Sequence, residues 1–189
     1  MSRDNRSGAS DEIRIGISAC LIGERVRWNG EHKRDSFLVD TVGRLVKYVP
    51  ACPEMELGLG APREPVRLVR DAGKAGATRL VEVSGGRDHT AAMDAWAAGR
   101  LKELARLDLC GFILKKDSPS CGLERVRVWD HDNVPSKSGR GRFATALIDA
   151  LPELPVEEEG RLSDPRLREN FVERVFAWRR LGNFFRGRW

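Results

Sequence analysis

The chain has 189 residues, of which 41% are hydrophobic and 32% charged, a composition typical of a globular protein with one main domain. No apolar run approaches the roughly 18 residues that a membrane span needs, and residues 1–11 lack the apolar core of a signal peptide, so we expect a cytoplasmic protein without membrane contact. The net charge of +5 favours anionic partners, although solubility alone would explain it equally well.

The N-terminal half of the chain alternates between strand and helix patterns. Residues 1–11 are polar, and we expect them to be disordered. Isoleucine alternates with small or polar residues over 13–18, which predicts a first strand. Helical spacing of apolar residues follows over 36–48, and a second strand is predicted over 46–50.

The pattern continues in the C-terminal half. Residues 79–84 and 110–114 are short apolar runs that predict strands, and residues 88–107 and 143–151 have the apolar stripes of helices. This order predicts an α/β, Rossmann-like layered fold with a mostly parallel sheet.

A C-terminal helical extension follows the layered domain. Residues 152–160 are acidic and contain proline, which suggests a linker, and Asp164–Pro165 has the residue types of a helix start. We expect Phe171, Val175 and Phe176 to pack this helix against the core. The predicted organisation is therefore a tail (1–11), a core domain (12–152) and a linker with its helix (153–189).

Three of the four cysteines lie just beyond predicted strands. Cys20, Cys52 and Cys121 follow the strands at 13–18, 46–50 and 110–114, whereas Cys110 lies within a strand. Carboxyl ends of parallel strands share one edge of a sheet, so the three thiols are able to converge there. Three thiolates without an obvious fourth ligand would suit an iron–sulfur cluster with one open iron. The alternative is that the chain has no metal site and that two of the cysteines are core residues and two are loop residues.

Three loops together resemble the family known as domain of unknown function 523, whose characterised members are thiouracil desulfurases. The resemblance spans about residues 13–151 and is carried by Ser-Ala-Cys-Leu-Ile-Gly at 18–23, Cys-Pro-Glu at 52–54 with Ala-Pro-Arg at 61–63, and Ser-Pro-Ser-Cys-Gly at 118–122. It implies a 4Fe–4S cluster held by Cys20, Cys52 and Cys121, with one iron open for the substrate sulfur. Cys110 matches no ligand position. Residues 154–174 resemble the opening of a second domain in longer relatives.

The same resemblance implies an active-site carboxylate and serine. Glu54 fits the carboxylate and Ser118 the serine, with Ser120 as a competitor for the second role and Glu56 for the first. The implied reaction is a non-redox removal of sulfur from a thiolated pyrimidine, as a base, nucleoside or nucleotide, with release of sulfide. Lys115 and Asp117 are interpreted as exposed charges, and Trp28 as either a packing or a base-stacking aromatic.

A second class of function remains open from the sequence. Net positive charge and the basic, aromatic residues near the C-terminus would also suit a metal-stabilised module that binds nucleic acid without catalysis, and contact with RNA or a nucleotide is a related possibility. Bound iron with acid-labile sulfide would distinguish the enzyme from a zinc-containing binding module.

Overall fold

The main sheet of the protein is four-stranded and entirely parallel. The computed structural model describes residues 12–73, 76–185 and 187, so the tail at 1–11 lies outside the described residues. The strand order is β2-β1-β5-β8, built from Lys47–Ala51, Arg14–Ser18, Leu109–Leu114 and Val156–Glu158. The α/β layered fold predicted from the sequence is confirmed.

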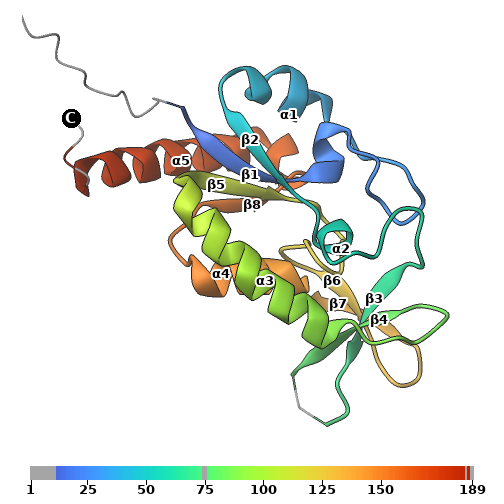
Figure 1. Ribbon diagram of the computed structural model, residues 1–189. Coiled ribbons are helices and arrows are strands. Elements are labelled where there is room, and N and C mark those ends of the chain that lie inside the picture. The colour runs from blue at the N-terminus through green and yellow to red at the C-terminus, as the bar shows by residue number, and fades with distance from the viewer. Residues whose placement is uncertain (1–11, 74–75, 186, 188–189) are drawn as a thin grey trace, which may run out of the picture.

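Helices cover both faces of this sheet (Figure 1). On one face lie α3 (Thr90–Leu104) and α4 (Arg142–Ala150). The ring of Phe143 in α4 packs edge-on against that of Phe112 in β5. On the other lie α1 (Ser36–Asp40) and α5 (Pro165–Phe185). The strongly apolar β5 is buried along its whole length, because it is central and covered on both faces.

A second, mixed sheet lies beside the first. Its order is β4-β3-β6-β7, formed by Thr78–Glu82, Val66–Arg70, Val126–Trp129 and Pro135–Gly139. The strand predicted over 79–84 belongs here, where it pairs antiparallel with β3. Met93, in the first half of α3, packs against this second sheet, whereas Leu101 and Leu104 of the same helix pack against the main sheet. One helix therefore contributes to the hydrophobic cores of both sheets. The remaining three strands are short or carry charge, and their sequence patterns did not indicate them.

Two segments differ from the sequence prediction. The helix expected over 36–48 ends at Asp40 and is followed by a 3₁₀ turn at Val42–Arg44, because residues 47–51 pair with β1 instead. Residues 152–160, whose acidic composition suggested a linker, contain β8. Its Glu157 and Glu158 are buried because their carboxylates accept hydrogen bonds, from Arg161 Nε and from the backbone amide of Leu123 respectively.

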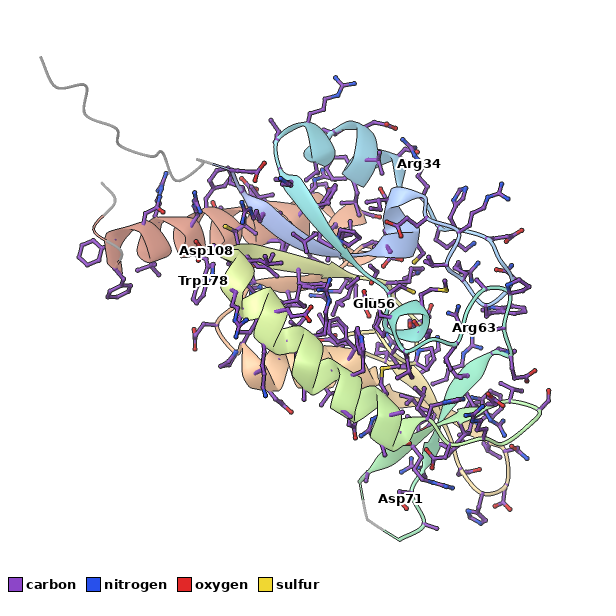
Figure 2. All side chains as sticks on the ribbon, in the orientation of Figure 1. Arg34, Glu56, Arg63, Asp71, Asp108 and Trp178 are labelled. Carbon is purple, nitrogen blue, oxygen red and sulfur yellow. The ribbon has the colours of Figure 1, made fainter. Side chains whose placement is uncertain are left out.

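The C-terminal helix is docked on the sheet. Phe171 and Val175 are buried against β1 and β5, and a Cβ on Gly111 would come within 2.9 Å of Val175, so glycine permits this close approach. Trp178, labelled in Figure 2, donates from Nε1 to the carbonyl of Leu109 at 3.1 Å. Phe176 is 46% exposed, so the prediction that it packs against the core is wrong. None of the described helices is both long and apolar enough to cross a membrane.

This docking predicts unequal effects for two phenylalanines of the same helix. Phe171→Ala is expected to lower the free energy of unfolding by about 3–5 kcal/mol, because it leaves a cavity in the core. Phe176→Ala, the matched control on the exposed side, should change it by less than about 0.5 kcal/mol. Urea denaturation of both variants measures the difference, and equal effects would contradict the docking.

Candidate functional site

Three cysteine loops meet at the carboxyl edge of the parallel sheet. Cys20 lies in the 3₁₀ turn Ala19–Ile22 directly after β1, and Cys52 precedes α2 (Pro53–Glu56) directly after β2. Cys121 lies in the loop that leaves β5. Since β2, β1 and β5 are neighbours, the three thiols line one cavity of about 480 Å³. Cys110 faces the apolar core beneath α5 and does not line it.

The three thiols share an environment that disfavours their ionisation. Burial raises the pKa of Cys20 to about 11 and that of Cys52 to about 12, and it holds the pKa of Cys121 well above its ordinary value. The negative charge of Glu54 also raises the pKa of all three thiols. The pKa of Cys121 is raised further by the sulfurs of Cys20 and Cys52. Ionisation of these thiols therefore requires a nearby positive charge that stabilises the thiolate form, and a coordinated metal supplies such a charge.

The donor set fits a cluster better than a single metal ion. No three His, Cys, Asp or Glu side chains of the described residues lie close enough together to hold one ion. The thiols are instead spaced around a cavity, which leaves room between them for a multinuclear group with thiolate ligands. A mononuclear zinc site with four close ligands is therefore not the arrangement seen here.

The Cys121 loop is attached to the first turn of α4. Backbone amides of Gly141, Arg142 and Ala144 donate to the carbonyls of Gly122, Pro119 and Ser120, at 2.7, 3.1 and 3.1 Å. Helix N-termini have amides without partners inside the helix, and the loop satisfies them. Within the loop, Ser118 Oγ accepts from the amides of Ser120 and Cys121, at 3.2 and 3.0 Å. The position of Cys121 thus depends on α4.

A single added carbon should disturb this attachment. A Cβ on Gly141 would lie 2.4 Å from the carbonyl oxygen of Ser120 and 2.8 Å from the amide nitrogen of Cys121. Because these are backbone atoms, the loop must move, and Gly141→Ala should cost about 1–3 kcal/mol of stability. We also expect it to lower the iron retained per chain after reconstitution.

Gly99→Ala in α3 is the control for this change. A Cβ there meets nothing within 4 Å, so the substitution should stabilise the protein by about 0.5–1 kcal/mol. Iron content and thermal unfolding of the two variants give the comparison. Equal iron content in both would show that the α4 attachment does not position Cys121.

Glu54 is held beside the thiols by a buried arginine. Glu54 lies in the first turn of α2, is only 7% exposed as a residue, and has Oε2 at 3.8 Å from Cys52 Sγ. Arg63 Nη2 lies 3.9 Å from the same oxygen, and Nη1 donates to the carbonyls of Val26 and Gly60, at 2.8 and 2.7 Å. Arg63 thus connects the first two cysteine loops. The sequence motif includes it, but its partners lie 3–37 residues away and were not predictable from spacing.

The competing residues take different positions. Ser118 lines the cavity, whereas Ser120 is fully buried, does not line it, and has a hydroxyl without a hydrogen-bond partner among the described residues. Glu56 accepts from the amide of Cys52 at 3.0 Å and pairs with Arg100 at 3.1 Å, so its contacts are structural. Figure 2 labels Arg63 and Glu56, which come from the loop after α2 and from α2 itself.

The remaining cavity residues include charges and one tryptophan. Trp28 lines the cavity and is 48% exposed. Asp117 is exposed, as predicted. The prediction that Lys115 is exposed is wrong, because its ammonium pairs with Glu159 and its side chain is largely buried. Ser18, which the sequence analysis did not single out, accepts from the amide of Lys115 at 3.0 Å and hydrogen-bonds to the Cys121 thiol. It therefore links the ends of β1 and β5 at the site.

Comparisons with known proteins agree with this arrangement. YbbK of Bacillus subtilis strain 168, described as an uncharacterized protein, is 35% identical over 111 residues, which are 57% of this chain and 72% of YbbK. A solved structure of the 4Fe–4S-dependent thiouracil desulfidase TudS is 30% identical, with a TM-score of 0.65, over 85% of this chain and 99% of that one. The sequence model of the 2-thiouracil desulfurase family matches residues 15–159, which include every cavity residue named above, and the chain therefore belongs to the 2-thiouracil desulfurase family.

Proposed function

We propose that this protein removes sulfur from a thiolated pyrimidine and releases it as sulfide, using a 4Fe–4S cluster held by Cys20, Cys52 and Cys121. The observation that carries the proposal is the meeting of three thiols and one buried carboxylate around a single cavity. Family membership and the likeness to a 4Fe–4S-dependent desulfidase support the same activity. With three protein ligands, a bound 4Fe–4S cluster would have one iron without a protein ligand.

The cluster, when bound, supplies a Lewis-acidic iron that prefers sulfur ligands and polarises the thiocarbonyl carbon. The protein's own groups then handle water and protons. Glu54, beside Cys52 and within the cavity, accepts a proton from the attacking water. Ser118 Oγ already accepts two backbone amides, so its hydroxyl hydrogen is available to donate to the heterocycle.

The overall reaction needs no electron donor or acceptor. Water oxygen forms a bond to the thiocarbonyl carbon, the carbon–sulfur bond breaks, and its electron pair leaves with sulfur. One thiocarbonyl and one water thus become one carbonyl and one hydrogen sulfide. Arg63 keeps the Glu54 carboxylate at the cavity wall throughout, through its contacts to the first two loops.

Anaerobic reconstitution tests the proposal. Protein loaded with iron and sulfide should be brown, contain about four iron and four labile sulfide per chain, and convert at least one of 2-thiouracil, 4-thiouracil, their nucleosides or nucleotides to the oxo form. Comparison of base, nucleoside and nucleotide identifies the substrate form. A colourless protein that binds zinc and shows salt-sensitive RNA binding would instead support the nucleic-acid-binding module. Contact with RNA or a nucleotide remains a prediction.

A further inference from the structure

A largely buried ion pair beside the cavity takes no part in the steps assigned to Glu54 and Ser118. Lys115 is the first residue after β5, and its Nζ lies 2.5 Å from Glu159 Oε1 and 3.0 Å from the carbonyl oxygen of Lys116. The two side chains are only 18% and 10% exposed. A surface lysine is normally mobile and solvated, so an ammonium held in this way is ordered by its surroundings.

Glu159 is itself fixed by the fold. It directly follows β8, its amide donates to the carbonyl of Leu114 at 3.1 Å, and its Oε2 accepts from the amide of Lys116 at 2.7 Å. One carboxylate therefore holds both the backbone and the ammonium of the segment that begins the Cys121 loop. Glu159 does not line the cavity, whereas Lys115 does.

The ammonium acts on the same site as Glu54 but with opposite sign. Lys115 and Glu54 both line the cavity that Cys20 lines, and their side chains carry opposite charges. The two groups come from different loops: Glu54 follows β2 and stands beside Cys52, while Lys115 follows β5. The cavity thus holds a carboxylate that suits proton transfer and a fixed cation that suits an anion.

We infer that Lys115 is a second charged group of the desulfuration, which stabilises the negative charge on the leaving sulfur, and that Glu159 positions it. This inference rests on the proposed function. When the carbon–sulfur bond breaks, its electron pair stays on sulfur while the water-derived oxygen remains on carbon. An ammonium fixed in advance stabilises that charge without reorganising at the moment of reaction. The amine keeps its proton, and no electron enters or leaves.

Substitutions at the pair test this role in the reconstituted protein. Lys115→Met removes the charge at similar length and should lower kcat about 10²–10³-fold, with KM changed less than about threefold. Lys115→Arg keeps the charge and should retain activity within about tenfold of the wild type. Glu159→Gln still accepts from the Lys116 amide but no longer pairs with the ammonium, so its kcat should fall by an intermediate factor.

Inhibition by added hydrosulfide gives a readout independent of turnover chemistry. Hydrosulfide is the product anion, and the inhibition constant, or the dissociation constant from spectral titration, should rise at least about tenfold in Lys115→Met. Glu157→Gln is the matched control. It alters the ion pair between Glu157 and Arg161, whose Oε1 and Nε atoms lie 2.7 Å apart. Glu157 lies in β8, two residues before Glu159, and neither partner lines the cavity, so this variant should leave hydrosulfide affinity unchanged.

The outcomes separate this inference from the proposed function. If the loaded wild type desulfurates no thiolated base, the proposed function fails, and the hydrosulfide titration still tests Lys115. If the wild type is active and Lys115→Met keeps both kcat and hydrosulfide affinity, the inference is overturned. If Lys115→Met fails to fold, the double variant Lys115→Met/Glu159→Gln replaces it, because it leaves no unpaired carboxylate. The double variant is expected to lose kcat and hydrosulfide affinity to the same extent. Wild-type kcat and hydrosulfide affinity in this variant would overturn the inference.

Discussion

Replacement of any one of Cys20, Cys52 and Cys121 by alanine should abolish the broad visible absorption of the reconstituted protein together with its desulfurase activity. Each thiol comes from a different loop of the same cavity, and the described residues offer no further cysteine there to replace it. With two thiolates left, the cluster has too few protein ligands to be retained. Iron and labile sulfide per chain, measured anaerobically, should fall close to zero in all three variants.

Cys110→Ala is the matched control for these variants. This cysteine is buried, as Cys20 and Cys121 are, but its side chain faces the core beneath α5 and its Sγ lies 3.7 Å from the carbonyl oxygen of Asp108. The change should cost about 1 kcal/mol of stability through lost packing and leave the cluster intact. An indispensable Cys110, together with a dispensable residue among the other three, would overturn the ligand assignment.

The second large effect is expected at Glu54. Glu54→Gln preserves the shape of the side chain and the approach of Arg63, but an amide does not accept the proton of the attacking water. The variant should assemble a normal cluster and desulfurate about 10²–10⁴-fold more slowly, the range typical of general acid–base groups. Under anaerobic conditions, the iron and sulfide content measures cluster assembly, and the single-turnover rate measures desulfuration.

Two serine variants accompany this experiment. Ser118→Ala should keep the cluster and lose rate, because the hydroxyl that lines the cavity is gone, whereas Ser120→Ala should be milder, since its hydroxyl does not reach the cavity. Near-wild-type turnover of Glu54→Gln would remove the carboxylate from the mechanism. Cluster loss in that variant would instead assign Glu54 a structural role beside Cys52.

Much of the fold and part of the site follow from local patterns in the sequence. The alternation around Ile15 and Ile17 predicted β1, and the spacing of Met93, Ala97, Leu101 and Leu104 predicted α3. Three cysteines just past predicted strands were expected at one edge of a sheet, and the structure brings them to one cavity. These inferences succeed because side-chain periodicity and the common direction of parallel strands are local properties.

Only the tertiary structure decided which distant residues meet. The acidic segment 152–160 becomes a buried strand because β5 offers it a free edge and because Arg161 Nε and the Leu123 amide satisfy Glu157 and Glu158. Lys115 is an internal cation because Glu159 lies beside it, 44 residues later in the chain. Arg63 reaches Val26 across 37 residues. Composition and spacing carry no information on such pairs, because contacts between distant residues are set by the packing of whole elements and not by the local chain.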